Sequence, residues 1–167
     1  MHYRPSVKGL HMLADSTSTK FLGEGEWKTK KHGAERSRQW RKAHLGIDAE
    51  TMQILAIVVT TSDVGESPVG TELLDQIPSH EKVASFTGDG AYDSQDGHEA
   101  CHRRRVILIT PPRKGARLRK GLAFTHRNEA VKACKRLGRA IWKRWGGCHR
   151  RSLVETKMNC FKRLGEK

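Results

Sequence analysis

The sequence predicts an α/β domain in which helices flank a mixed β-sheet. Short runs rich in Val, Ile and Leu alternate with segments of helical spacing over the first two thirds of the chain, whereas the last third contains only helical patterns. That order of elements is typical of one sheet with helices packed on it. Because a chain of 167 residues has the usual length of one domain, we expect residues 1–167 to form a single domain.

Three strands are expected in the first part of the chain. The first lies within residues 9–18 (GLHMLADSTS) and is expected to end at Asp15 and Ser16, where the apolar run gives way to Ser and Thr. Residues 21–40 combine glycines and charges without a clean period, so we expect a loop or irregular insert there. Residues 43–48 and 54–61 then form a hairpin, and its second arm (ILAIVVTT) has the Ile and Val content of a central strand.

Two helices and two strands follow in alternation. Turn residues precede a helix that begins near Pro68, because proline suits the first turn of a helix. A strand at residues 82–90 (KVASFTGDG) is followed by a helix at residues 92–104. The next strand, at residues 105–112, stops at two prolines, which cannot continue a β-ladder.

The last third predicts a basic loop and two helices. Residues 111–121 (PPRKGARLRKG) form the basic loop. A helix over residues 125–145 has its start signal at Thr125, and two glycines separate it from a second helix over residues 149–165. The side chains that we expect to face the core are Ala130, Val131, Cys134, Leu137, Ile141, Trp142, Trp145, Leu153, Val154, Met158, Phe161 and Leu164.

The positive charge is concentrated in the last third of the chain. Residues 1–110 carry 14 Lys and Arg against 15 Asp and Glu, whereas residues 111–167 carry 18 against 3. A charge distribution this uneven attracts polyanions, of which nucleic acid is the commonest. The alternative is a solvated helical face, but 18 like charges repel one another unless a partner neutralises them. We therefore expect a nucleic-acid partner whose binding weakens steeply with salt.

The sequence carries no recognisable signal for export or membrane insertion. The N-terminal segment MHYRPSVKGLHMLADS lacks the long apolar core of a signal peptide, and no run approaches the ~18 apolar residues of a membrane-spanning helix. The four cysteines include no CxxC pair, and their spacing with the nine histidines matches no structural zinc pattern. We therefore expect a cytoplasmic protein with reduced thiols and no membrane association.

Two aspartates are expected at the ends of strands. Asp15 ends the first strand, and Asp89 lies in GDGAYD (residues 88–93), directly after the apolar run VASF. Neighbouring strands that point the same way bring their ends together, roughly 5 Å apart per strand step, so these carboxylates can meet at a metal site. The alternative is a tight turn, in which the glycines supply conformational freedom. We interpret Asp93 as a helix cap and Asp63 as a loop residue.

A third carboxylate, Glu155, lies in a helix otherwise rich in cations. One explanation is an ion pair with Arg151, four residues earlier, which is worth only a few tenths of a kcal/mol. Arg151, Glu155 and Lys162 also share one stripe of the helix, which would present a carboxylate between two cations. Three carboxylates can hold a pair of Mg²⁺ ions about 3.5–4 Å apart, which activate the nucleophile and stabilise the leaving oxygen of a phosphodiester.

Several segments resemble a known family. LADSTSTK, GDGAYD and CHRRSLVETKMNCFK resemble the three acidic motifs of bacterial insertion-sequence DDE transposases, in the group with a Tyr-x2-Arg-x3-Glu-x6-Lys signature. GEGEWKTKKHG, WRKAHLGID, TTSDVGES and PPRKGARL also resemble segments of that group, so the resemblance covers residues 8–166. It implies a ribonuclease-H-like core, metal-dependent DNA strand cleavage and strand transfer at the ends of the element, and a homodimer on DNA.

The resemblance also implies roles for individual residues. The catalytic and metal-binding acids are expected to be Asp15, Asp89 and Glu155, with Mg²⁺ or Mn²⁺ as the cofactor and two ions bound. Arg151 and Lys162 match the Arg and Lys of the signature, whereas its Tyr falls at Cys148. A thiol cannot replace the reach or the hydrogen bond of that tyrosine. The cations expected to contact DNA are Arg151, Lys162, Arg150, Lys157, Arg113 and Lys114.

The resemblance leaves alternatives for the function of this chain. Only 14 residues precede Asp15, where family members usually carry a helical DNA-end-binding region, so we expect an N-terminally truncated catalytic domain with a trimmed last helix. We expect it to act in the cytoplasm at the nucleoid. The alternatives are an inactive remnant that only binds nucleic acid, and a ribonuclease-H-like nuclease unrelated to transposition. Trp27 and Trp40 either stack on bases or pack against protein.

Overall fold

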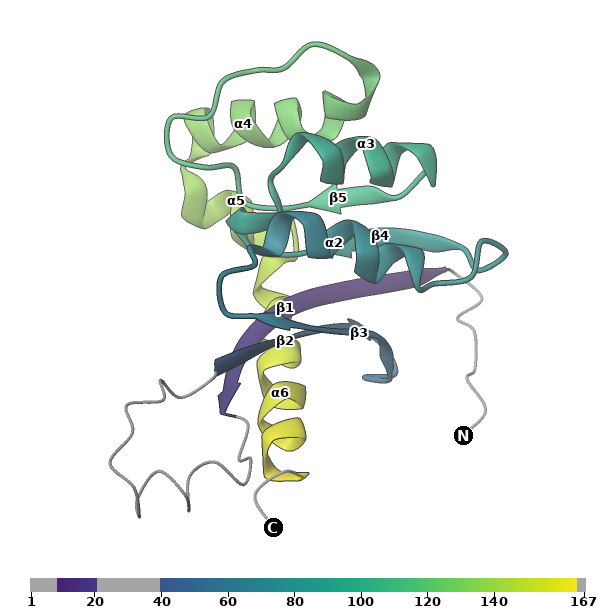
Figure 1. Cartoon of the computed structure of the whole chain (residues 1–167). Helices are drawn as coiled ribbons and strands as arrows, with labels where there is room; N and C mark the ends of the chain where they lie inside the picture. The colour runs from purple at the N-terminus through teal and green to yellow at the C-terminus, as the bar shows by residue number, and fades with distance from the viewer. Residues whose placement is uncertain (1–8, 21–39, 165–167) are drawn as a thin grey trace.

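The computed structural model describes residues 9–20 and 40–164, and its centre is a five-stranded mixed sheet (Figure 1). The strands are β1 (Leu10–Lys20), β2 (Trp40–Asp48), β3 (Ile54–Thr61), β4 (Val83–Thr87) and β5 (Ile107–Ile109). They lie in the order β3-β2-β1-β4-β5, with β1, β2 and β3 antiparallel and with β4 and β5 parallel to β1. The predicted α/β class is confirmed, and the sheet has the ribonuclease-H-like arrangement.

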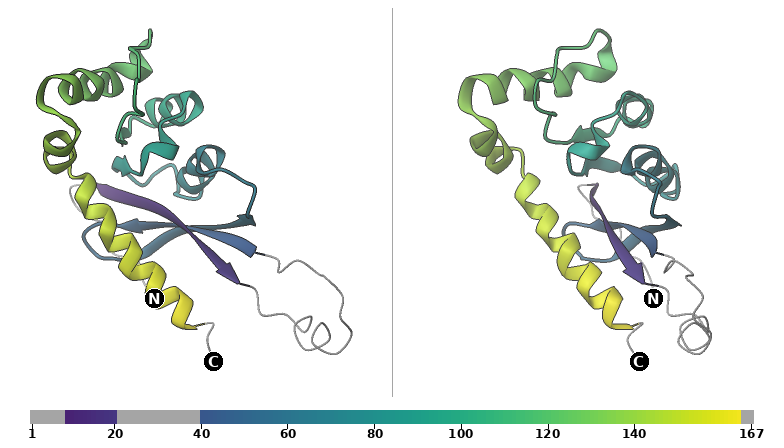
Figure 2. Two further views of the ribbon diagram at one scale, coloured as in Figure 1. Left: turned by 90° about the vertical axis from the view of Figure 1, so that its left-hand side faces the viewer. Right: turned by 60° about the vertical axis from the view of Figure 1, so that its left-hand side comes forward.

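Helices cover both faces of the sheet (Figures 1 and 2). They are α2 (Glu66–Asp75), α3 (Gln95–Arg103), α4 (Thr125–Leu137), α5 (Arg139–Trp145) and α6 (Ser152–Leu164), with the 3₁₀ turns η1 (Gly90–Tyr92), η2 (Leu122–Phe124) and η3 (Cys148–Arg151). α2 and α3 lie on one face, whereas α6 crosses the other face against β1 and β2. α4 and α5 connect the two sides at the β5 end of the sheet.

Alternation along β1 divides the core into two layers. Met12 and Ala14 pack on the α2 side, where Leu73 is fully buried. Leu13, between them, packs on the other side with Val154 of α6. Successive side chains of a strand point to opposite faces, so one strand contributes to both layers. The same alternation directs Asp15 to the α6 side, which decides the partners of its carboxylate.

β3 is an edge strand and not the central strand that its composition predicts. Ile57 and Val59 are 40% and 52% exposed, so the Ile and Val content of this strand reflects the preference of branched side chains for extended backbone and not burial. Part of its open edge is covered by a side chain. The Ile57 N–H donates to Gln76 Oε1 at 3.1 Å, and Gln76 Nε2 donates to the Ile57 carbonyl at 3.0 Å.

β1 is longer than predicted, and Asp15 lies in its interior and not at its end. Pairing with β2 continues without interruption from Met12 opposite Asp48 to Lys20 opposite Trp40. The polar second half of β1 therefore keeps its extended form because a neighbouring strand supplies its hydrogen bonds, which a local pattern cannot reveal. β5, in contrast, is shorter than predicted, since only three residues of its expected run form a strand.

The helix expected over residues 125–145 is two helices. Gly138 has φ of +86°, a conformation that glycine adopts readily, and it ends α4 before α5 begins. Apolar spacing counted across this break therefore does not define one buried face. Ile141 and Trp145, which were expected in the core, are 46% and 74% exposed, and Trp142 is only partly buried.

The other expected helices are present. α2 begins at Glu66, slightly before Pro68, and α6 directs Val154 and Met158 into the core as predicted. The expectations for residues 21–39, including Trp27, and for the side chains of Trp40 and Leu164 fall outside the described part of the chain. Within the described ranges, the helices are all too short or too polar to span a bilayer.

Candidate active site

Asp15 and Asp89 lie level with each other on neighbouring strands. β1 and β4 are parallel, and their register places Leu13 beside Thr87. Asp15 and Asp89 each follow that pair by two residues. Asp89 follows the end of β4 and is the N-cap of the turn η1. Its Oδ1 accepts a hydrogen bond at 2.8 Å from the backbone N–H of Ala91, the second residue of that turn. The carboxylate is therefore held at the end of β4 by the turn that it caps.

Asp15 is a half-buried carboxylate in a crowded electrostatic environment. Its Oδ1 accepts a hydrogen bond from the Ser16 backbone N–H at 2.9 Å. Burial raises the pKa of Asp15 above its usual value, and the Ser16 hydrogen bond and the Arg151 charge offset part of that rise. The negative charges of Asp89 and Glu155 raise it further. The structure thus brings the three acids into one electrostatic neighbourhood.

Arg151 lies between Asp15 and Glu155. Its Nη1 is 3.0 Å from Asp15 Oδ2, and its Nη2 is 3.7 Å from Glu155 Oε1. The i,i+4 ion pair considered for the sequence is therefore present, but the same guanidinium also binds a strand residue far away in the chain. α6 is held on the sheet by Val154 and Met158, while the Glu155 side chain is 59% exposed.

Asp89 and Glu155 line a hollow of about 430 Å³ whose wall also contains four Arg and Lys side chains. The cations that line it are Arg139, Lys143, Arg144 and Arg151. Three of these belong to α5 and were not singled out from the sequence. The spacing of Arg139 and Lys143 places them on one helix face, but only the break at Gly138 turns that face toward the carboxylates.

The donor set fits a divalent metal ion by its chemistry, although its present geometry is not closed around one point. Carboxylate oxygens are the ligands that Mg²⁺ and Mn²⁺ prefer, and the charges of Asp89 and Glu155 both act on Asp15. Within residues 9–20 and 40–164, however, His, Cys, Asp and Glu side chains form no group of three that is close enough to hold an ion. The Arg151 guanidinium takes the position of a cation between two of the acids.

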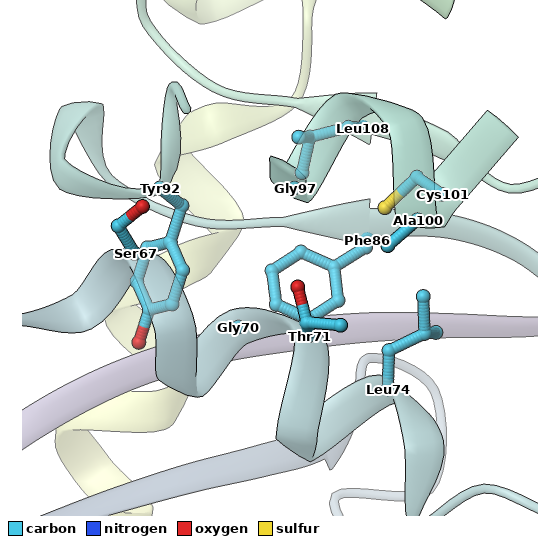
Figure 3. A pocket seen from close by; sticks show the side chains of 10 residues that line it. All are labelled: Ser67, Gly70, Thr71, Leu74, Phe86, Tyr92, Gly97, Ala100, Cys101 and Leu108. Carbon is cyan, nitrogen blue, oxygen red and sulfur yellow. The ribbon is translucent and has the colours of Figure 1, made fainter. Parts of the chain in front are cut away.

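The glycines around Asp89 make room for an aromatic ring. A Cβ on Gly88 would lie 2.6 Å from the Tyr92 ring, and one on Gly70 of α2 would lie 2.8 Å from the same ring. Figure 3 shows Tyr92 and Phe86 beside Gly70, around a cavity of about 10 Å³ that has room for about one water molecule. Tyr92 thus fastens the GDGAYD turn to α2, and this close packing is what Gly88 permits.

Asp93 is not the helix cap that the sequence predicts. The cap of α3 is Ser94, whose Oγ accepts a hydrogen bond from the Gly97 N–H at 3.1 Å. Asp93 is buried and binds Arg127 of α4 and His98 of α3 instead. Its partners come from later elements, so no local signal identifies this role.

The other cations that the sequence analysis assigned to DNA binding lie in the basic loop, in η3 and on α6. Arg113 lies in the basic loop and donates from Nε to the Gly90 carbonyl at 3.3 Å, next to Asp89. Arg150 donates to the Ala49 carbonyl at 3.2 Å, which ties η3 to the β2–β3 turn. Lys114 is exposed in the basic loop, and Lys157 and Lys162 are partly buried on α6.

Two further residues named from the sequence are placed by the structure. Cys148 is partly buried at the start of η3 and lines the hollow, and burial raises the pKa of its thiol. Asp63 lies in the turn after β3, which agrees with the prediction of a loop residue. Of these two, only Cys148 is close to the carboxylates.

Two comparisons with known proteins show what this chain is similar to. The family model described as the transposase DDE domain matches residues 8–167. Among solved structures, the chain is similar to one chain of the cryo-EM structure of the simian T-cell lymphotropic virus intasome in complex with the PP2A regulatory subunit B56 gamma. The match has 18% identity and a TM-score of 0.42, and it covers 65% of this chain and 34% of that chain. The present chain thus corresponds to about a third of the length of that neighbour.

Proposed function

The chain belongs to the transposase DDE domain family, and we propose that it is the catalytic core of a bacterial insertion-sequence transposase. In this proposal it cleaves DNA strands at the ends of the element and transfers them to target DNA, as a homodimer in the cytoplasm at the nucleoid. Residues 1–167 act as one catalytic domain. The observation that supports the proposal is the placement of Asp89 and Glu155 on one hollow, with Asp15 joined to Glu155 through Arg151.

We propose that the acids hold the metal and that the cations bind the DNA. Asp15, Asp89 and Glu155 would hold Mg²⁺ or Mn²⁺, with two ions bound. Such a pair, when bound, activates the attacking oxygen and stabilises the leaving oxygen. Arg151 orients the Asp15 carboxylate through its 3.0 Å contact and must yield part of that contact when a divalent ion is held there.

The cationic wall is proposed to fix the DNA backbone. Arg139, Lys143 and Arg144 of α5 line the same hollow as Asp89, and we propose that they bind phosphates of the DNA backbone there. Lys162 and Lys157 extend the positive surface along α6, and the basic loop with Arg113 and Lys114 extends it on the other side of Asp89. The strong positive charge of residues 111–167 supports this assignment.

Metal-dependent nicking of plasmid DNA tests the proposal. We expect the protein to nick a plasmid that carries the ends of the element in the presence of Mg²⁺ or Mn²⁺, and Asp89→Ala to reduce that rate by at least about a thousandfold, because a lost metal ligand removes several kcal/mol of transition-state stabilisation. DNA binding in EDTA should remain. Nicking of plasmids with and without the ends at equal rates would instead indicate a nuclease unrelated to transposition.

The second candidate function is nucleic-acid binding without catalysis. Cys148 stands where the signature has a tyrosine, and Arg151 occupies the space between two acids. Intact DNA binding with no nicking in either metal would favour this remnant. Cys148→Tyr separates the two candidates further, because restored nicking would trace the defect to the missing hydroxyl.

A further inference from the structure

We propose that Asp93 and Arg127 are a positioning pair that couples the basic loop, residues 111–121, to the placement of Asp89. The inference rests on the proposed function, in which the basic loop contacts DNA and Asp89 holds metal. Neither Asp93 nor Arg127 contacts the hollow, so they act through other residues.

The pair itself is buried and fully engaged. Arg127 donates from Nε to Asp93 Oδ1 at 2.7 Å and from Nη2 to Asp93 Oδ2 at 3.2 Å, and the two side chains are 5% and 1% exposed. His98 Nε2 lies 3.0 Å from the same Oδ1. Burial alone raises the pKa of Asp93, but the bonds from His98 and Arg127 outweigh it and hold the pKa far below its usual range. A two-pronged contact of this kind fixes orientation as well as distance.

The same arginine also holds the basic loop. Arg127 Nη1 donates to the Arg117 carbonyl at 2.8 Å. The next residue, Asn128, accepts a hydrogen bond from the Arg119 N–H at 2.9 Å and donates to the Arg119 carbonyl at 2.7 Å. α4 therefore grips the loop backbone at two points, so a displacement of the loop acts directly on the Arg127 guanidinium.

The Asp93–Arg127 pair links the basic loop to the turn that carries Asp89. Asp89 and Asp93 are the two flanking residues of the three-residue turn η1. Asp89 closes the first end through Ala91, and Arg127 fixes the second end through Asp93. Only three residues separate these anchors, so the position of Asp93 limits the positions open to Asp89. Phosphate binding by the basic loop would thereby stiffen the turn before cleavage.

Hydrogen exchange of residues 86–93, followed by mass spectrometry in EDTA, tests the coupling without any catalytic readout. We expect a 30-base-pair duplex to slow exchange of the Ala91, Tyr92 and Asp93 amides about tenfold in the parent protein. In Arg127→Met the duplex should still bind within about threefold, because no loop cation is removed, but the slowing should be lost. Slowing that persists in Arg127→Met, or that is absent in the parent protein, overturns the proposal.

Arg104→Met is the matched control. Arg104 also holds carbonyl oxygens, those of Leu74, Ile77 and Pro78, but it joins α3 to the end of α2 and does not touch the basic loop. We expect this variant to lose stability and to keep the DNA-dependent slowing. Loss of the slowing in the control as well would mean that any weakened arginine contact has this effect, which contradicts a specific coupling.

Single-turnover cleavage at saturating DNA separates positioning from binding. Arg127→Met and Asp93→Asn should lower the rate about tenfold without a matching loss of affinity, and Arg127→Lys should recover part of it, since its charge remains while the second prong is lost. Arg127→Lys and Asp93→Asn also serve if Arg127→Met does not fold. Absence of cleavage in the parent protein would refute the proposed function and leave the exchange result to decide the coupling.

Discussion

The sheet with α2 and α3 differs from the segment from α4 to α6 in buried apolar side chains and in charge. The first region contains most of the buried apolar side chains, including Leu73 and Phe86, and its charges nearly cancel. The second carries most of the excess positive charge, and none of the residues of α5 is buried. Asp15 and Asp89 belong to the first region, whereas Glu155 and the cationic wall belong to the second.

This difference suggests a division of labour within the site. Strand pairing and a dense core fix two carboxylates, which suits groups that must hold an ion in one geometry. The cations are carried by elements with few buried contacts, and such elements open and adjust more easily. In the proposed function, the adaptable region would therefore contact the long, variable DNA and supply Glu155, whereas the rigid region would supply the other two metal ligands. The predictions below test this division, beginning with the largest expected effect.

Truncation of the two cores should have unequal consequences. Leu73→Ala, in the core under α2, should lower the free energy of unfolding by about 3–5 kcal/mol, whereas Met158→Ala in the smaller core under α6 should cost about 2–3 kcal/mol. Urea unfolding followed by circular dichroism measures both values. In Met158→Ala, hydrogen exchange should increase in α6 and not in β4. Equal losses spread over the whole chain would contradict a division into two regions.

Gly88→Ala should destabilise the turn that carries Asp89. The added methyl group would lie 2.6 Å from the Tyr92 ring, so we expect a loss of about 1–3 kcal/mol in the free energy of unfolding and a lower nicking rate. Gly65→Ala is the matched control, because nothing lies within 4 Å of its added methyl group. Because Gly65 is the N-cap of α2, where Gly is preferred to Ala, the control should lose less than about 1 kcal/mol and should keep the parent nicking rate. A neutral Gly88→Ala would show that the ring does not fix this turn.

The charges of α5 should determine part of the salt dependence of DNA binding. Replacing Lys143 and Arg144 together by Met should make the slope of log affinity against log salt shallower by about 1.8, since each lost phosphate contact contributes about 0.9. The double replacement of Lys132 and Lys135 on α4 removes the same charge at exposed positions outside the hollow. A slope that changes equally in both variants would indicate general attraction and not a defined cationic wall.

The smallest effect is expected from Asp15→Asn on stability. Burial raises the pKa of Asp15, so the folded state binds a proton more tightly than the unfolded state and the ionised carboxylate costs stability at neutral pH. The variant should therefore melt at a slightly higher temperature at pH 7. The difference should shrink as pH falls through the raised pKa toward the usual value of 3.8.

Asp63→Asn is a control in which the pKa shift of the replaced carboxyl group has the opposite sign. A hydrogen bond from Thr61 lowers the pKa of Asp63, so its ionised form favours the folded state, and this variant should not melt at a higher temperature at pH 7. A lower melting temperature for Asp15→Asn would mean that the Arg151 contact outweighs the burial of the charge.

Local patterns were sufficient for much of the fold, and they also singled out acids that we propose as metal ligands. The hairpin at β2 and β3, the strand before GDGAYD and the core-facing positions of α6 depend on neighbours within a few residues, which a sequence displays directly. Asp89 and Glu155 were identifiable because each is unusual in its immediate surroundings, one after an apolar run and the other among cations. The uneven charge also follows from composition alone.

Only the tertiary structure decided which distant groups meet. It extends β1 beyond Asp15, places Arg151 between two acids, turns α5 toward the hollow at Gly138, and buries Asp93 against Arg127. These features depend on partners that are 20 or more residues apart, or on the direction of the chain after a single glycine. Periodicity reports how one segment divides between buried and exposed faces, whereas the partner of each face is chosen by packing of the whole chain.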